Sequence, residues 1–356
     1  MKNRIKKLQE LMIKDGIKQI VVYDYMSIFY LTGIKTKPTL FFQALLVNSN
    51  KDAELVYYYI QRYNLVYKNI ENVKMVTYSQ YEDGVDFFAK RISSSKVLLD
   101  KKIPLGFASA IQNKVNLTFE LDYLVDSIRE IKDEQEINYI KEASKISDDT
   151  IFYAKSLLKP GISEKQLQEA IIDFIKKSGA DGVSFTPFVM FDIDVSYNSG
   201  NTDRVFTKNS YAMIDLGARY KGYCGDTTRM YFHRSNVEEV KLYKQVLEAN
   251  MAAIASIKEG ISFEDVDKED KKVLNKYGIL DYNYFPTGHS VGLSIHELDY
   301  VMLNNKKLLK EGMVFSVEPG VYIQGKIGAR VEDLVLVKKN GCEVLNHTSK
   351  EDIFLD

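Results

Sequence analysis

The chain has 356 residues, of which 45% are hydrophobic and 27% charged, and its formal net charge is -1 at pH 7. This composition is typical of a soluble globular protein large enough for two domains. The near-zero charge gives no reason to expect nucleic acid or anionic lipid as a partner. No apolar run reaches eighteen residues, so no membrane span is expected. Two cysteines outside any C-x-x-C pair favour a reducing, cytoplasmic setting.

The first part of the chain alternates helical and extended patterns. An apolar stripe from Ile5 to Met12 at helical spacing stops at Gly16, which predicts an amphipathic helix rather than a signal peptide. Apolar runs rich in Val, Leu and Tyr predict strands at 18–24, 41–48, 53–59, 73–78 and 96–100. We therefore predict an α/β domain over residues 1–125, built on a mixed sheet, and find no candidate site in it.

The pattern changes near Asp126, where we predict a second domain over residues 126–356. A long helical pattern runs from there to Pro160, and Ser163 with Gln166 forms a capping box for the next helix. Two more helices are predicted at 237–258 and 263–277, and strands at 211–216, 222–232, 313–324 and 328–338. Helices covering an antiparallel sheet make this an α+β domain.

Two aspartates lie in IDLGARYKGYCGDTTRMYF, residues 214–232, which has the pattern of a β-hairpin. If Tyr220 and Lys221 form a two-residue turn, the numbers of cross-strand partners sum to 441 and Asp215 faces Asp226. Two bare carboxylates so placed would repel, and the pKa of one would rise. Taken alone, such a pair is more often a solvated turn than a site.

Further acidic residues change that balance. Glu318 ends an apolar strand just before Pro-Gly, and Glu332 lies inside another strand, where alternation puts Arg330 on the same face. The segment FPTGHSVGLSIHE supplies His289 and His296, which are two of only four histidines in the chain. The sequence therefore offers carboxylates and an imidazole that a folded sheet could bring together.

Two Asp, two Glu and one His form an oxygen-rich ligand set, and two divalent cations would neutralise its four negative charges. Such sites suit manganese first, with cobalt, zinc or iron able to substitute. Paired ions lower the pKa of a shared water and polarise the carbonyl under attack. We therefore predict two divalent metal ions as cofactors.

Four motifs resemble those of the pita-bread metallopeptidases, a group that contains methionine aminopeptidase, Xaa-Pro aminopeptidase, prolidase and creatinase. IDLGARYKGYCGDTTR resembles D-x-G-x(4)-G-Y-x-x-D-x-T-R, and TGHSVGLSIHE resembles T-G-H-x-[IV]-G-L-x-x-H-E. GMVFSVEPGVY and GARVEDLVLV match the last two motifs. The N-terminal half resembles the creatinase/prolidase N-terminal domain, which methionine aminopeptidase lacks. The resemblance implies a pita-bread catalytic domain after that domain, and a homodimer.

The resemblance also implies roles for individual residues. The metal ligands would be Asp215, Asp226, His289, Glu318 and Glu332. Asp215 would chelate one ion with both oxygens, Asp226 and Glu332 would bridge the ions, and His289 and Glu318 would complete the other coordination sphere. Glu318 would also handle the proton of the attacking water.

Other residues of the motifs would contact the substrate. His296 matches the outer histidine that contacts the scissile peptide, and Thr228 shares a strand face with Asp226. Arg330 matches an arginine of the proline-specific branch, and could pair with a bridging carboxylate or with a substrate carboxylate. One position departs from the pattern: Asn198 stands where members of the family carry another substrate-site histidine. Asparagine can donate or accept a hydrogen bond, but it cannot shuttle a proton.

The main hypothesis is a dinuclear metal-dependent hydrolase that cleaves Xaa-Pro bonds in short peptides, as an Xaa-Pro aminopeptidase or dipeptidase, with a metal-bridging hydroxide as nucleophile. One alternative is a creatinase-like C–N hydrolase that acts on a small molecule. Another is a peptidase-fold binding protein with weak activity, because Asn198 replaces the histidine. Intact ligands favour the main hypothesis, since retired members of such folds lose them.

Overall fold

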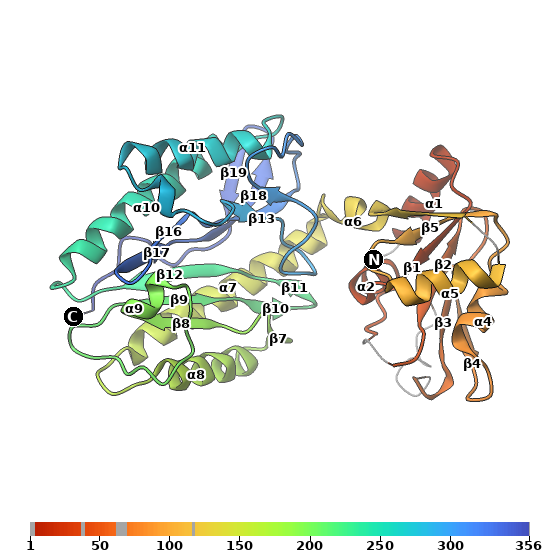
Figure 1. The fold of residues 1–356 in the computed structure, drawn as a ribbon, viewed down its shortest axis with the longest axis horizontal. Helices are drawn as coiled ribbons and strands as arrows, with labels where there is room; N and C mark the ends of the chain where they lie inside the picture. Colours follow the sequence, from red (N-terminus) through yellow and green to blue (C-terminus); the bar gives the residue numbers. More distant parts are fainter. Residues whose placement is uncertain (1–3, 37–39, 62–69, 116–117, 356) are drawn as a thin grey trace. The chain divides into compact units, whose positions relative to one another are not determined.

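The computed structural model describes residues 4–36, 40–61, 70–115 and 118–355. The chain divides into two compact units, Met1–Arg129 and Glu130–Asp356. Each unit is described by itself (Figure 1). The sequence-based boundary, after residue 125, falls inside the last helix of the first unit, α6 (Leu124–Arg129).

The first unit is built on a six-stranded mixed sheet in the order β4-β3-β2-β1-β5-β6. Its strands are β1 (Gln19–Val22), β2 (Ala44–Asn48), β3 (Ala53–Tyr58), β4 (Val73–Tyr78), β5 (Lys96–Asp100) and β6 (Thr118–Asp122). Its helices are α1 (Arg4–Lys14), α2 (Tyr25–Thr32), α4 (Gly84–Ala89), α5 (Leu105–Val115) and α6, with a 3-10 turn at Tyr59–Gln61. The five predicted strands are confirmed. The sixth, β6, was not predicted, because an edge strand with exposed Leu121 lacks the apolar run of the others.

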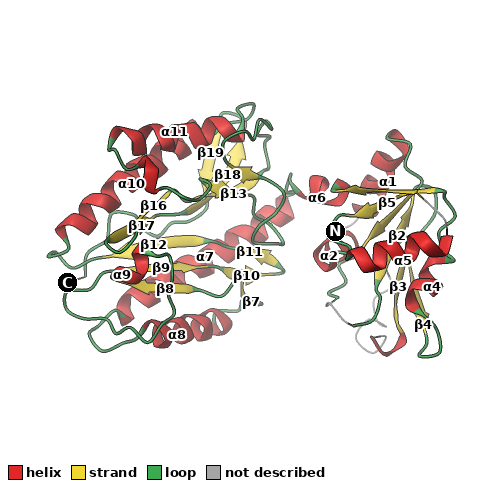
Figure 2. Ribbon diagram, viewed as in Figure 1, coloured by secondary structure: helices red, strands yellow, loops and turns green. Residues whose placement is uncertain are grey.

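The second unit consists of short antiparallel strands between helices (Figure 2). Its helices are α7 (Glu134–Leu157), α8 (Glu164–Lys177), α9 (Ile193–Ser196), α10 (Val237–Ser256) and α11 (Phe263–Lys276), with a 3-10 turn at Leu280–Tyr282. Its strands are β7 (Gly182–Val183), β8 (Phe188–Phe191), β9 (Ala212–Leu216), β10 (Ala218–Tyr220), β11 (Tyr223–Cys224), β12 (Thr227–Tyr231), β13 (Gly288–His289), β14 (Tyr300–Val301), β15 (Val314–Val317), β16 (Gly320–Ile323), β17 (Ile327–Arg330), β18 (Asp333–Lys338) and β19 (Gly341–Val344).

The helix starts follow their capping residues. The predicted capping box of Ser163 and Gln166 is present at the start of α8. The single long helix predicted from residue 126 is wrong in its continuity, because α6 ends at Arg129 and α7 begins only at Glu134, behind the N-cap Asp133. The residues just before it are extended instead, and Ile131 forms a β-bridge with Met313.

The central sheet of the second unit, β8-β9-β12, separates two apolar cores. Ala212 and Ile214 of β9 pack with residues of α7 and α8, whereas Met213 packs with residues of α10. Figure 1 shows α7 and α8 on one side of this sheet and α10 on the other. Alternation places Asp215 on the same face as Met213. Asp215 is therefore directed into the interior between the sheet and the C-terminal strands.

The predicted register of the hairpin is wrong. Asp215 pairs with Thr228, and cross-strand partners sum to 443, not 441. The turn is centred on Lys221 and Gly222, both with positive φ (50° and 91°), as a two-residue turn with matching twist requires. Glycine adopts this conformation readily, so it draws the turn one residue further along the chain. Asp226 is consequently a diagonal neighbour of Asp215 on the same face.

The long strands predicted in this unit are each interrupted. Asp226 lies between β11 and β12, Glu318 between β15 and β16, and Glu332 between β17 and β18. Side chains at such breaks are free of strict alternation, which lets three carboxylates from different strand pairs converge. Pro319 follows Glu318 and lacks an N–H for a ladder hydrogen bond, which accounts for one of the breaks.

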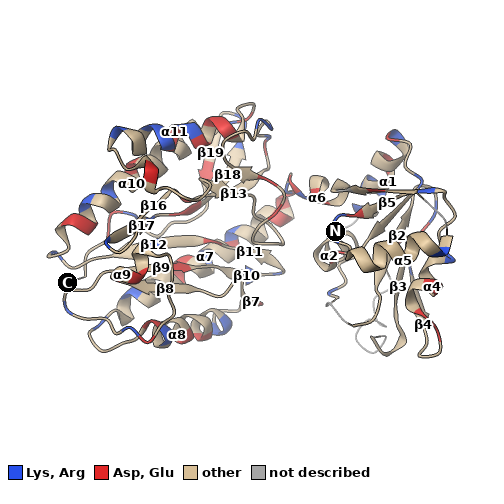
Figure 3. Cartoon of the chain, viewed as in Figure 1, with Lys and Arg blue, Asp and Glu red and all other residues tan. Residues whose placement is uncertain are grey.

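Charged residues of both signs lie along α10 and α11 (Figure 3). Among the helices of the described residues, none is both long enough and apolar enough to span a membrane.

Candidate metal centre

A cavity of about 300 Å³ lies in the second unit. All five carboxylate and histidine residues predicted as ligands line it, and so do three of the predicted substrate-site residues, Asn198, His296 and Arg330. The remaining lining residues are Phe185, Phe188, Phe285, Pro286, Gly288, Ile295, Tyr300, Gly320 and Tyr322. Residues from segments far apart in the sequence thus form one site.

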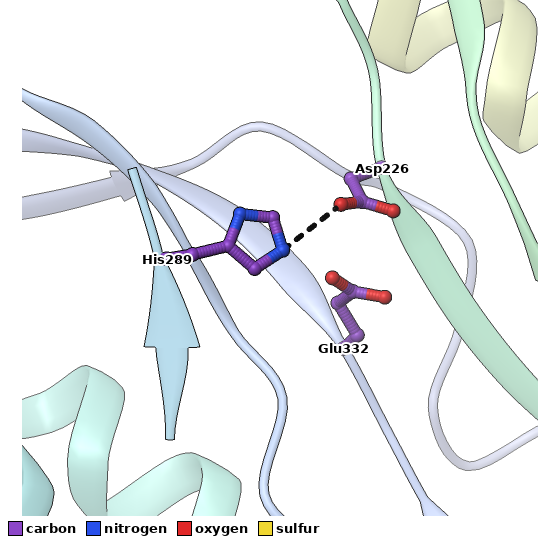
Figure 4. A group of neighbouring side chains, drawn as sticks. All are labelled: Asp226, His289 and Glu332. Carbon is purple, nitrogen blue, oxygen red and sulfur yellow. Dashed lines mark ion pairs between the residues drawn. The ribbon is translucent and has the colours of Figure 1, made fainter. Parts of the chain in front are cut away.

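Three of the lining residues, Asp226, His289 and Glu332, form one group of neighbouring side chains (Figure 4). One potential ligand atom from each lies within 4.8 Å of the others, and all three residues are buried. Nε2 of His289 is 3.6 Å from Oδ2 of Asp226. Gly288 makes this placement possible, because a Cβ there would lie 1.8 Å from the carbonyl oxygen of Ser316. These three side chains are close enough for one cation to contact all of them.

Glu318 lies beside the same imidazole. Its Oε1 is 3.1 Å from Nε2 of His289 and accepts a hydrogen bond of 2.9 Å from the hydroxyl of Ser316. The same hydroxyl accepts a hydrogen bond of 3.0 Å from the backbone N–H of His289. Ser316 therefore fixes the strand carrying His289 against the strand that ends at Glu318.

Asp215 is held by Arg330, whose Nη2 contacts its Oδ2. Nη1 of Arg330 donates to Oδ1 of Asn198 (3.1 Å) and to the hydroxyl of Tyr322 (2.6 Å). Nε of Arg330 donates to the hydroxyl of Thr228 (3.1 Å). This partner of Arg330 differs from the bridging carboxylate that was predicted, because Asp215 was expected to chelate one ion and not to bridge the two. The pairing with a substrate carboxylate stays a prediction.

Thr228 lies behind the carboxylates and not on the cavity surface. It is fully buried, and its hydroxyl donates to Oε2 of Glu332 at 2.8 Å while accepting from Arg330. Thr228 thus links the arginine to a carboxylate predicted to bridge the ions.

The carboxylates perturb one another. Burial raises the pKa of Asp226 well above its usual value, and repulsion from Glu332 and Asp215 raises it further. Burial, Glu318 and Asp215 raise the pKa of Glu332 likewise. Burial raises the pKa of Asp215 to about 6 despite the nearby Arg330. Burial alone would raise the pKa of Glu318, but the hydrogen bond and charge of His289 lower it below the usual value.

This arrangement fits divalent cations. Oδ1 of Asp215 is buried and has no hydrogen-bond partner among the described residues. Four carboxylates share the cavity with one guanidinium, and buried charge without compensation is costly. Oxygen ligands with a single imidazole are the donor set that manganese, iron, cobalt or zinc accepts. Divalent cations would supply the missing positive charge and a partner for Oδ1.

His296 stands on the outer side of His289, with ring centroids 4.2 Å apart. Its imidazole also stacks with the ring of Tyr300 at 6.3 Å and an interplanar angle of 20°. Burial and the neighbouring His289 lower its pKa. His296 therefore lines the same cavity as the candidate metal ligands and lies next to one of them, His289.

Several functional candidates were missed in the sequence. Ser316 lies two residues before Glu318 in the apolar run that was predicted as one strand, so alternation along that predicted strand could have placed it on the same face. Tyr322 and the apolar wall residues Phe185, Phe188 and Phe285 gave no comparable signal, because aromatic residues at strand and loop positions are more often core residues.

Comparisons with known proteins identify the family of both parts of the chain. Residues 138–339 match the model of metallopeptidase family M24, and residues 4–131 match the creatinase/prolidase N-terminal domain. A protein of Staphylococcus epidermidis described as an uncharacterized peptidase is 31% identical over 352 residues, covering 98% of this chain and 99% of its own length.

Solved structures resemble the whole chain. The prolidase of Thermococcus sibiricus has a TM-score of 0.91 at 33% identity, covering 99% of both chains. The Xaa-Pro dipeptidase of Bacillus anthracis has a TM-score of 0.90 at 26% identity, covering 99% of both chains. The two-domain organisation with a creatinase-type N-terminal domain and a pita-bread domain is confirmed. The chain belongs to metallopeptidase family M24, in the branch that carries a creatinase/prolidase N-terminal domain.

Proposed function

We propose that this protein is a dinuclear metal-dependent hydrolase that cleaves the Xaa-Pro bond of short peptides, as an Xaa-Pro dipeptidase or an Xaa-Pro aminopeptidase. The observation that carries the proposal is the convergence of four carboxylates and one imidazole on a single cavity, with three of the carboxylates buried and that of Glu318 20% exposed. The similarity to a prolidase and to an Xaa-Pro dipeptidase supports the choice of substrate.

In this proposal, the five ligands hold two divalent ions, manganese first and cobalt, zinc or iron as substitutes. Asp215 is held for this role by Arg330, and Glu332 by Thr228. When bound, the ions would acidify a water and polarise the peptide carbonyl. The carboxylate of Glu318, fixed by Ser316, accepts the proton of the attacking water.

The substrate is held by the outer residues of the cavity. His296 donates a hydrogen bond to the peptide at the scissile bond, where its ring already lies against Tyr300. Oδ1 of Asn198 accepts from Arg330, which leaves its Nδ2 group to donate to a substrate carbonyl or carboxylate. The apolar wall formed by Phe185, Phe188 and Phe285 suits a proline ring and excludes water. A cytoplasmic location and a homodimer belong to the same proposal.

Purified protein loaded with Mn²⁺ tests the proposal on an Xaa-Pro dipeptide and an Xaa-Pro tripeptide. We expect cleavage before proline of at least one, and none of the matched peptides with alanine in place of proline. Metal analysis of the same sample is the control. A protein that binds no more than trace Mn, Fe, Co or Zn after reconstitution would contradict the metallohydrolase itself.

Asn198 favours a second candidate, a creatinase-like C–N hydrolase acting on a small molecule. A cavity without the additional histidine has one proton-carrying group fewer for peptide turnover. If the protein binds metal but cleaves neither peptide, two alternatives remain: this hydrolase and a binding protein on the same fold. Turnover of small guanidino or amidino compounds would then separate the two.

A further inference from the structure

The loop between β13 and β14 carries His296 to the cavity and has no helix or strand of its own. Its ends are tied by the backbone: the N–H of Glu297 donates to the carbonyl of Ser290 (2.9 Å), and the N–H of Ser290 donates to that of Asp299 (2.7 Å). A side chain on such a loop is positioned only as well as the loop itself. The place of the His296 ring therefore depends on what holds the loop from within.

The carboxylate of Glu297 fills the inside of this loop. Its Oε1 accepts hydrogen bonds from the backbone N–H groups of Leu293 (3.1 Å) and Ser294 (3.5 Å). It lies against Gly292, where an added Cβ would be 2.6 Å from Oε1. The side chain is 6% exposed. The backbone on the N-terminal side of His296 is thus wrapped around the side chain of the residue that follows it.

Lys132 supplies the opposite charge. Its Nζ is 3.2 Å from Oε2 of Glu297, and its side chain is 1% exposed. The backbone N–H of Lys132 donates to the carbonyl of Gly312 at 2.9 Å, next to the bridge between Ile131 and Met313. The ion pair therefore ties the loop to a fixed part of the second unit.

A second ion pair near the same loop offers a comparison. Nζ of Lys307 contacts Glu130, and it lies 2.8 Å from Oδ2 of Asp299. The side chain of Lys307 is 34% exposed, and within the described residues the side chain of Asp299 makes no hydrogen bond to the backbone of Leu293 or Ser294. This pair ties the end of the loop without entering it.

We propose that Glu297 is a positioning residue for His296. Its carboxylate, neutralised by Lys132, holds the backbone N–H groups of Leu293 and Ser294 and thereby sets the position of the His296 ring at the cavity. The importance of that ring for peptide cleavage rests on the proposed function. Its position in the folded protein does not.

Two double variants separate the effect of the hydrogen-bond acceptor at position 297 from the effect of the Glu297 charge. Both Lys132→Met/Glu297→Gln and Lys132→Met/Glu297→Ala remove the buried ion pair, so neither leaves an unpaired charge. Gln retains an oxygen that can accept from the two N–H groups, whereas Ala has none. A difference between these variants therefore reports the acceptor. Circular dichroism and thermal unfolding check that each variant is folded.

Histidine ring signals give a readout that needs no activity. The chain has four histidines, so protein labelled with ¹³C in the imidazole gives four ring signals, and His296→Asn assigns one of them. In metal-free and in Zn²⁺-loaded protein, we expect the His296 signal to shift or broaden in the Ala variant and to stay near its wild-type position in the Gln variant. Signals of His233 and His347 should not change. Lys307→Met should leave the His296 signal in place.

Kinetics on an Xaa-Pro peptide form the second arm. We expect the Ala variant to lose about ten- to a hundredfold in kcat/KM at unchanged metal content, because small misplacements of a contacting group have effects of that order. The Gln variant should stay within about threefold of wild type. An unchanged His296 signal in the Ala variant would overturn the positioning role. A shifted signal in a protein that cleaves no peptide would leave it standing and overturn the proposed function alone.

Discussion

Glu332 and Asp333 are adjacent carboxylates, both buried, with opposite surroundings. Asp333 accepts from Nη2 of Arg229 and from Nζ of Lys350, each at 2.6 Å. Glu332 accepts one hydrogen bond from the hydroxyl of Thr228 and otherwise faces the carboxylates of the cavity, which raise its pKa. The charge of Asp333 is therefore neutralised by two cations, whereas the charge of its neighbour Glu332 is not.

The difference separates two uses of buried charge. A carboxylate with two cationic partners is part of the fold, and removing it leaves those cations unpaired. A carboxylate kept among like charges reduces the stability of the metal-free protein, so its retention indicates a ligand or a reaction. Removing the first kind of carboxylate should lower the stability of the protein, and removing the second kind should lower its activity.

Glu332→Gln should produce the largest effect on activity. Gln can still accept from Thr228 but carries no charge, so we expect loss of bound metal and a fall in kcat/KM of about 10⁴-fold, since metal ions contribute several kcal/mol to such transition states. In chelator, the variant should be at least as stable as wild type, because a repelling charge is gone. Elemental analysis and urea unfolding measure both. Full metal content with a wild-type rate would contradict the role of Glu332.

Asp333→Asn should have the opposite profile. We expect the free energy of unfolding to fall by about 3 kcal/mol, the lower end for breaking a buried ion pair, because Arg229 and Lys350 keep their charges. The variant that still folds should bind metal as wild type does. Urea unfolding in chelator measures the loss. A stable variant with low metal content would mean that Asp333 acts on the cavity and that the contrast with Glu332 is false.

Removing the metal should distinguish Glu332 from Asp333 again, through a smaller change in the free energy of unfolding. Free Mn²⁺ at 100 times its dissociation constant should stabilise the wild-type protein by about 2.7 kcal/mol relative to chelator, since the ion binds the folded state only. The stabilisation should persist in Asp333→Asn and disappear in Glu332→Gln. Equal stabilisation of both variants would place the bound ion outside this cavity.

The sequence predicted the fold through features that are local or periodic. Capping residues such as Ser163 marked a helix start, and strand alternation correctly placed Glu332 and Arg330 on one face, where both hydrogen-bond to Thr228. The cavity residues were predicted as a group because their motifs resemble a known family. Their roles as ligands remain predictions, which the variants above would test.

The rest depended on details that no pattern carried. The predicted hairpin turn was misplaced by one residue. Whether the two turn residues are Tyr220 and Lys221 or Lys221 and Gly222 depends on the backbone twist. The partner of Arg330 depended on which carboxylate the fold brings within reach, and Asp215 is 115 residues away along the chain. Long-range contacts of this kind are set by how elements pack, which spacing within a motif does not reveal.

Asn198→His should have the smallest effect and is the sharpest test of the outer cavity. Asn198 has a φ of 49°, a conformation that histidine tolerates better than most residues, so the backbone should accept the change. An added imidazole can carry a proton, and we expect kcat/KM for an Xaa-Pro peptide to rise by about tenfold, below the usual range for acid–base catalysis because His296 already serves there.

Asn198→Asp is the matched control for this change. It retains the oxygen that accepts from Arg330 and loses the Nδ2 donor, so it should weaken peptide binding while Arg330 stays in place on Asp215. Metal content should be unchanged in both variants, because among the described residues Asn198 hydrogen-bonds to Arg330 and to none of the five ligands. Lower metal content in Asn198→His without a gain in rate would mean that the residue acts through Arg330 on Asp215. Residue 198 would then affect metal binding as well as substrate binding, and having asparagine there in place of histidine would change how the ligands hold the metal.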